Sequence, residues 1–151
     1  MTKNARLLAT LLVTGTSVLT FTTPVTNRVP DDWPQWRGKN RDGISTETGL
    51  MKSWPQGGPP LAWRTGGAGE GYSSFATAHG RLYTLGARGG NEYVMAFDAN
   101  TGKKVWETRN GARFDNDRGG GPRGAPAVDG NQLYVLGASG HETTKQCLEC
   151  G

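Results

Sequence analysis

The chain has 151 residues, of which 34% are hydrophobic and 20% charged, and it contains 24 glycines and 8 prolines. This glycine content is too high for a helical bundle, and the spaced aromatic and aliphatic residues argue against a disordered chain. The net charge of +4 is small and no block of lysines and arginines occurs, so we expect no nucleic-acid-binding surface. Many short strands between glycine- and proline-rich turns are typical of an all-β fold.

Residues 1–26 have the layout of a secretory signal peptide. Lys3 and Arg6 form a basic start, and an uncharged, mainly apolar stretch follows from residue 7 to residue 21. An uncleaved membrane anchor is the alternative. The threonines and the proline in this region suit a membrane helix poorly, because such a helix needs about 20 mainly apolar residues. We therefore expect an exported protein, periplasmic or extracellular, without a stable membrane span.

Residues 27–65 are expected to form a leading segment ahead of the regular strands. This segment contains the sequence WPQWRG at residues 33–38 and a Gly-Gly-Pro-Pro turn at residues 57–60. Its last five residues, 61–65, resemble residues 104–108, since both stretches place a tryptophan at their centre. The pattern predicts a short closing strand at residues 61–65.

The sequence repeats itself at an offset of 51 residues. The segment Leu-Tyr-Thr-Leu-Gly-Ala at residues 82–87 returns as Leu-Tyr-Val-Leu-Gly-Ala at residues 133–138. A period near fifty residues, built from short strands and glycine turns, is typical of repeat proteins such as β-propellers, whose blades have about 40–50 residues. We therefore predict a first blade at residues 66–110 and a second, truncated blade at residues 111–151, about one and a half blades in all.

Each blade is predicted to be built from antiparallel strands, four in a complete blade. In the first blade the strands are expected at residues 73–78, 82–85, 92–97 and 104–109. Residues 93–97 are apolar at every position, which indicates that both faces of this sheet are covered. In the second blade strands are expected at residues 124–128 and 132–136, with the end of a third at 147–148. Residues 142–146 are much more polar, which indicates either a degraded strand there or a shift of the reading frame at residues 141–146.

A tight polar turn joins the last two strands of the first blade and carries the motif A-x-D-x-x-T-G-x-x-x-W. The fixed residues of the motif are Ala96, Asp98, Thr101, Gly102 and Trp106. Asp98 is expected to accept hydrogen bonds from the turn backbone, and Thr101 to do so more weakly. Gly102 is expected to supply the positive φ that a tight hairpin needs.

This motif resembles the repeat of pyrroloquinoline quinone (PQQ)-like β-propellers. The WPQWRG segment and the segment GYSSFA at residues 71–76 also resemble bacterial exported members of that family. The resemblance covers about residues 33–151. It implies a propeller of four-stranded blades, of which this chain is an N-terminal fragment with the remaining blades as its partners. It also implies that Trp106 docks between neighbouring blades, where a buried tryptophan covers about 150–250 Å².

The family that the chain resembles contains two functional classes. Quinoprotein dehydrogenases bind PQQ and a calcium ion at the propeller centre and use a carboxylate base and often a pair of adjacent cysteines, whereas other members only present binding surfaces. The two cysteines of this chain, Cys147 and Cys150, are not adjacent, and no carboxylate is assigned as the base. We therefore expect a non-catalytic binding or scaffold module without a cofactor or metal of its own. The alternative is the N-terminal part of a PQQ-dependent quinoprotein alcohol or sugar dehydrogenase, whose full-length form would hold PQQ and calcium.

The loop at residues 110–123 is the candidate ligand-binding segment. Its charged residues, which would contact an anionic ligand, a protein or a polymer, are Arg113, Asp115, Asp117, Arg118 and Arg123. Residues 115–120 open like a calcium loop but lack a third acidic ligand and the closing glutamate. A glycine-rich surface loop without a ligand is the alternative.

Overall fold

The computed structural model describes residues 32–140 and 142–146, and within these ranges it contains strands and no helix. The first sheet is antiparallel and consists of β1 (Phe75–Ala78), β2 (Arg81–Arg88), β3 (Asn91–Asp98) and β4 (Lys104–Ala112), in that order. The second sheet is antiparallel and consists of β5 (Ala127–Asp129), β6 (Gln132–Leu136) and β7 (Glu142–Gln146). The prediction of an all-β fold is confirmed. The expected signal peptide and the expected strand end at 147–148 lie outside the described residues.

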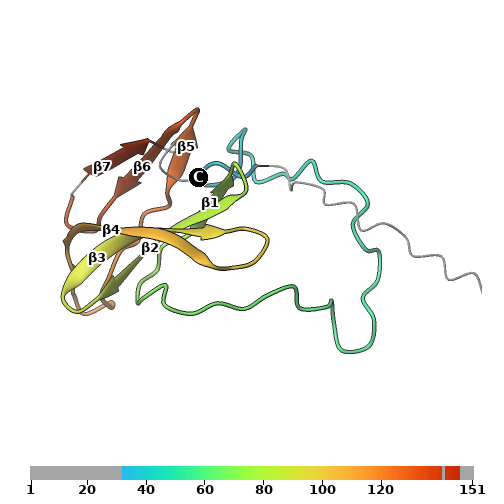
Figure 1. Ribbon diagram of the computed structural model, residues 1–151, viewed down its shortest axis with the longest axis horizontal. Coiled ribbons are helices and arrows are strands. Elements are labelled where there is room, and N and C mark those ends of the chain that lie inside the picture. Colours follow the sequence, from blue (N-terminus) through green and yellow to red (C-terminus); the bar gives the residue numbers. More distant parts are fainter. Residues whose placement is uncertain (1–31, 141, 147–151) are drawn as a thin grey trace, which may run out of the picture.

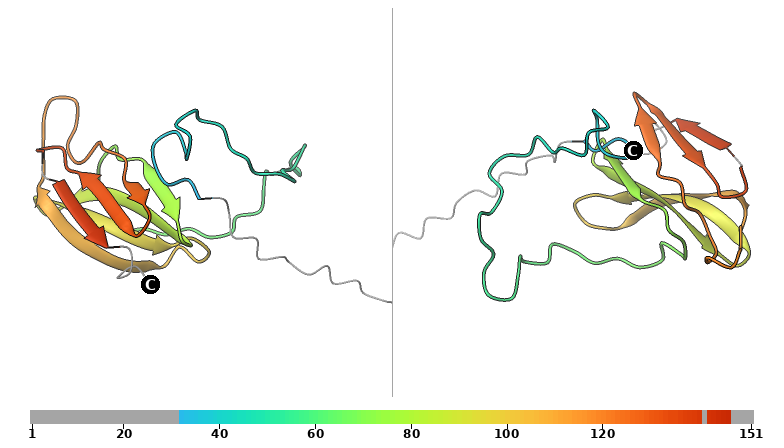
Figure 2. Two further views of the ribbon diagram at one scale, coloured as in Figure 1. Left: turned by 90° about the horizontal axis from the view of Figure 1, so that it is seen from above. Right: turned by 180° about the vertical axis from the view of Figure 1, so that it is seen from behind.

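The two sheets lie side by side and pack through one face each (Figures 1 and 2). Alternate residues of a strand point to the same face of a sheet, so every second position contributes to the contact. The first sheet contributes Ala78, Tyr83, Leu85, Val94 and Ala96 to the shared core, and the second sheet contributes Leu133 and Val135. Trp106 and Val128 pack against this cluster from its margin.

The repeat offset of 51 residues carries Tyr83 and Leu85 of β2 onto Tyr134 and Leu136 of β6. Tyr83 and Leu85 are buried against the second sheet, whereas Tyr134 and Leu136 are 46% and 51% exposed. The reason is that β6 contacts the first sheet through its other alternating residues. The second sheet therefore leaves open the same face that the first sheet uses to bind it.

The outer face of the first sheet, which points away from the second sheet, is covered at the end of β2 by the chain that leads into β1. A Cβ atom added at Gly86 would lie 1.7 Å from the carbonyl oxygen of Ala68. Glu70 and Ala87 exchange two backbone hydrogen bonds of 2.9 and 2.7 Å. Consistent with the predicted covering of both faces, β3 buries four consecutive residues, Val94, Met95, Ala96 and Phe97.

The prediction of a closing strand at residues 61–65 is wrong. These residues have no strand pairing. They lie on the part of an extended loop that returns toward the sheets (Figure 1). Trp63 makes the contact with its side chain instead: its Nε1 donates a hydrogen bond of 3.0 Å to the carbonyl oxygen of Ala99. A strand requires its own backbone groups to be paired along a sheet edge, and here the ring alone reaches the turn.

The prediction of a degraded strand at residues 142–146 is also wrong, because these residues form β7 and pair with β6 along its whole length. Backbone hydrogen bonds do not depend on the polarity of the side chains, and polar residues are common on edge strands. The first five strands also differ from their predicted bounds; for example, β2 runs to Arg88 rather than to residue 85. β5 begins at Ala127, directly after Pro126, which has no N–H to donate. β4 continues to Ala112, past the predicted end at residue 109.

Candidate functional site

The motif turn between β3 and β4 is closed by hydrogen bonds to Asp98. Its Oδ1 accepts from the backbone N–H groups of Asn100 (3.0 Å) and Thr101 (2.9 Å) and from the Thr101 hydroxyl (2.9 Å). Gly102 has a φ of 69° and donates its N–H to the carbonyl oxygen of Asp98 at 2.8 Å. These bonds, first among them the one from the Thr101 side chain, lower the pKa of Asp98 because they stabilise the charged carboxylate. The turn has the hydrogen bonds that its sequence predicts.

Trp106, the last residue of the motif, lies on β4 at the junction of the two sheets. It packs against the shared core, and its ring centroid is 6.3 Å from that of Tyr83. Ala96, its partner across β3 and β4, is fully buried. These contacts give both residues a structural role.

The five charged residues of the predicted ligand loop do not converge on one site. Arg113 forms ion pairs with Asp115 (2.8 Å) and Glu70 (2.7 Å), and these pairs, first that with Asp115, raise its pKa. Its charge is therefore balanced by its neighbours. Asp117 and Arg118 are exposed. Among residues 32–140 and 142–146, no group of three or more His, Cys, Asp or Glu side chains that could hold a metal ion occurs.

Arg123 points to a different place from Arg113. Its Nη2 donates to Asn116 Oδ1 (3.1 Å) and to the carbonyl oxygen of Gly119 (2.6 Å), and its guanidinium carbon lies 5.1 Å from the ring centroid of Tyr72. A cation over an aromatic ring is attracted by the negative face of the ring. Arg123 thereby reaches a groove that the sequence patterns did not reveal.

This groove, here called the Trp36 groove, lies where the leading segment meets the first and second sheets. It consists of two cavities of about 500 and 400 Å³ that share Trp36 and Ala125 in their walls. Other side chains that line it are Arg37, Arg41, Tyr72 and Arg123. Sequence reasoning missed the groove because its walls come from three segments far apart along the chain. The local sequence signal was the adjacent Trp36 and Arg37 within WPQWRG, an aromatic and a basic residue side by side.

The leading segment is anchored to both sheets. Trp33 and Thr77 of β1 exchange backbone hydrogen bonds of 2.8 and 2.9 Å, and the carbonyl oxygen of Pro34 accepts a bond of 2.7 Å from the N–H of Val128 in β5. These bonds fix the backbone at residues 33 and 34, just ahead of Trp36. The aromatic wall of the groove is therefore held by regular backbone pairing.

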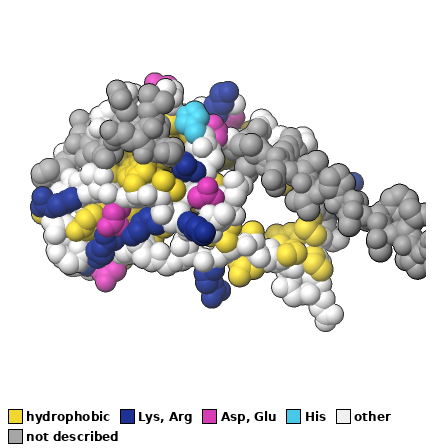
Figure 3. Space-filling view, in the orientation of Figure 1, with side chains coloured by type: hydrophobic (Ala, Val, Ile, Leu, Met, Phe, Trp, Pro, Cys, Tyr) yellow, Lys and Arg dark blue, Asp and Glu magenta, His cyan; other side chains and the backbone are white. Residues whose placement is uncertain are grey.

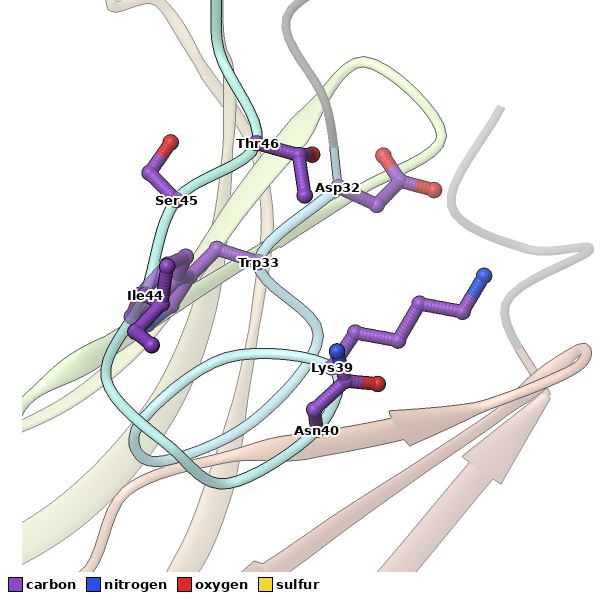
Figure 4. A pocket seen from close by; sticks show the side chains of 7 residues that line it. All are labelled: Asp32, Trp33, Lys39, Asn40, Ile44, Ser45 and Thr46. Atoms are coloured by element: carbon purple, nitrogen blue, oxygen red, sulfur yellow. The ribbon is translucent and has the colours of Figure 1, made fainter.

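Another cavity, of about 480 Å³, is formed by the leading segment itself (Figure 4). Asp32 and Lys39 bring opposite charges to its wall, and Ile44 and Trp33 bring apolar groups. Asp32 is already engaged, because its Oδ1 accepts a bond of 3.2 Å from the N–H of His79. The mixed charges give this cavity less preference for one class of ligand than the Trp36 groove has.

Comparisons of the chain with models of protein families, with curated proteins and with solved structures found no match. Across the part of the chain that the structure describes, there is no helix of the length and apolar character needed to cross a membrane.

Proposed function

We propose that the chain is a non-catalytic, exported β-propeller module of the PQQ-like type, whose stacked sheets serve as a binding scaffold. The observation that supports this most is the relation between Tyr83 and Tyr134. These residues are equivalent in the repeat, yet one is buried between the sheets and the other is 46% exposed on the open face. Burying an apolar side chain of this size is favourable by about 1.5–3 kcal/mol. The proposed occupant of the open face is a further blade of the same propeller.

The first test of this proposal is to read the gene beyond codon 151. We expect more copies of A-x-D-x-x-T-G-x-x-x-W, spaced by about 50 codons. A stop codon with no further repeat in any frame would contradict the proposal of a larger propeller. An acidic metal-binding constellation together with adjacent cysteines in later blades would favour the quinoprotein dehydrogenase instead.

The second test is a titration of the full chain with PQQ, followed by tryptophan fluorescence. A non-catalytic module is expected to show no saturable quenching in the micromolar range. A dissociation constant of about 1 μM or less, worth about 8 kcal/mol of binding free energy, would contradict the non-catalytic proposal.

Export is tested by the mass of the protein recovered from the periplasm or medium of an expressing bacterium. We expect a mature chain that begins near residue 27, because residues 1–26 have the layout of a cleaved signal. Recovery of the uncut chain in the membrane fraction would support the anchor in its place.

A further inference from the structure

We infer that the Trp36 groove binds an acidic oligosaccharide, with sugar rings lying on Trp36 and Tyr72 and carboxylates pairing with the arginines. The inference rests on the proposed binding function and names the ligand class and the site. The two adjoining cavities, of about 500 and 400 Å³, fall in the size range of small-molecule sites, about 300–1,000 Å³.

The charge of the groove favours an anion. Arg37, Arg41 and Arg123 line it, and no aspartate or glutamate does. Within the described residues these three arginines donate to neutral acceptors. Arg37 Nη2 donates to the carbonyl oxygen of Asp42 (3.3 Å), and Arg41 Nε donates to Gln35 Oε1 (3.0 Å). Arg123 donates to Asn116 Oδ1 and to the carbonyl oxygen of Gly119, as described above. A guanidinium has five N–H donors, so most of them remain for a ligand. Their planar fork matches the two oxygens of a carboxylate.

The aromatic residues favour a sugar. Trp36 is 63% exposed and Tyr72 is 61% exposed, and both line the same cavity, so two exposed rings are brought together at one place on the surface. The faces of aromatic rings carry negative charge density, which complements the slightly positive C–H groups on the face of a sugar ring. Tyr72 is held in place by the loop beneath it, since a Cβ atom at Gly119 would lie 2.3 Å from its hydroxyl oxygen.

The backbone presents two of the arginines in a fixed way. Arg37 and Arg41 have φ values of 65° and 60°, in the left-handed region that side-chain-bearing residues rarely adopt. Such conformations cost free energy and persist where surrounding bonds hold them. Here the N–H of Gly43 donates to the carbonyl oxygen of Arg37 at 2.9 Å, and the N–H of Gly38 donates to that of Gln35 at 2.9 Å. The strained turn therefore fixes the backbone from which the two arginine side chains extend to line the groove.

An acidic peptide is the competing ligand, and the groove suits it less well. Aromatic residues that dominate protein interfaces lie in enclosed, desolvated pockets. In the Trp36 groove both rings are more than half exposed, so they form an open surface rather than an enclosed pocket. A flat, hydroxyl-rich ligand makes better use of such a surface.

The inference is tested by calorimetric titration of the full chain with trigalacturonate. Its methyl ester serves as the neutral ligand of the same length, and triglutamate as a peptide of similar charge. We expect trigalacturonate to bind at least about tenfold more tightly than either, with an affinity that falls as salt is raised.

Variants identify the site. Trp36→Ala is expected to weaken trigalacturonate binding at least about tenfold, and Arg37→Gln about fivefold. The matched controls are Trp54→Ala, since Trp54 is 68% exposed outside the groove, and Arg64→Gln, and both are expected to bind as the parent chain does. Unfolding midpoints of all four variants show whether a loss of binding reflects a loss of folding.

Three results would overturn the inference: no binding of trigalacturonate by the full chain at millimolar concentration, equal losses in Trp36→Ala and Trp54→Ala, or equally tight binding of triglutamate through the same residues. None of these results would contradict the proposed scaffold function, because that proposal rests on the packing of the sheets and not on the groove. Conversely, tight PQQ binding would refute the proposed function whatever trigalacturonate does.

Discussion

The outer faces of the two sheets differ in chemistry, although the sheets share a repeat. On the first sheet, Glu107 forms ion pairs with Lys104 (2.6 Å) and Arg88. Figure 3 shows basic and acidic side chains interspersed over β3 and β4. On the second sheet, the outer face instead exposes Tyr134 and Leu136. The comparison shows that the repeat does not fix the chemistry of an outer face: the first sheet has charges and covering chain there, whereas the second sheet exposes apolar side chains.

The largest expected effect comes from comparing equivalent tyrosines. Tyr83→Ala is expected to lower the free energy of unfolding by about 4 kcal/mol, because it empties a fully buried site between the sheets. Tyr134→Ala, at the equivalent exposed position, is expected to cost less than about 1 kcal/mol. Urea unfolding of both variants measures the difference. Equal losses of unfolding free energy would show that Tyr134 is as buried as Tyr83 in solution.

A smaller effect tests how the outer face of the first sheet is covered. Gly86→Ala is expected to cost about 3 kcal/mol, since the added methyl group would collide with backbone at Ala68 rather than with a movable side chain. Gly66→Ala is the control, because no atom lies within 4 Å of its new methyl group, and it is expected to change stability by less than about 0.5 kcal/mol. A Gly86 variant as stable as the control would mean that the covering chain moves away easily.

A buried carboxylate links the two halves of the molecule. Glu92 on β3 is fully buried and accepts hydrogen bonds from the N–H groups of Phe114 (3.5 Å) and Ala138 (3.1 Å), the latter in the loop after β6. Glu92→Gln replaces one acceptor oxygen with a donor and is expected to cost about 2 kcal/mol. Thermal unfolding measures this loss, with Asp117→Asn as the exposed control. Identical midpoints for the two variants would contradict a stabilising role of Glu92 between the sheets.

The smallest effect is expected at the motif turn of the first sheet. The pKa of Asp98 is lowered from 3.8, so the stability it supplies is present above about pH 3.8 and is lost as the pH falls through its folded value. Asp98→Ala is expected to lower the midpoint of thermal unfolding at pH 7 by about 5 °C. The variant should also lose less stability than the parent chain between pH 4 and pH 2. A parallel pH dependence in both proteins would contradict this role.

The sequence predicts the parts of the fold that depend on neighbouring residues. β2, β3 and β6 follow from apolar stretches between glycine turns, and the three hydrogen bonds that Asp98 Oδ1 accepts come from residues within three positions of it. The contact of Trp63 with Ala99 spans 36 residues, and no local pattern distinguishes it from a strand. Glu92 likewise looked like an ordinary strand residue, because its partners come from other segments.

The same reason explains why the candidate site was predicted only in part. Arg123 was named as part of a charged loop. Tyr72, over whose ring it lies, and Trp36, which lines the same cavity, belong to segments that come together only when both sheets are paired with the leading segment. Arg113 was named for the same loop, and its charge is balanced by Glu70, a residue 43 positions away. Composition identifies such residues as charged, whereas topology decides which of them meet.

The open face at Tyr134 has a consequence for symmetry. The two sheets contact each other through different faces: the first uses the face that carries Tyr83, and the second uses the face opposite to Tyr134. The rotation that relates them is therefore head-to-tail. Repeating such an operation either returns to the starting sheet and closes a ring or continues as an open filament. The number of sheets in a finished assembly is then set by the rotation between neighbours, and a small change of packing around Trp106 would alter that number without changing any one sheet.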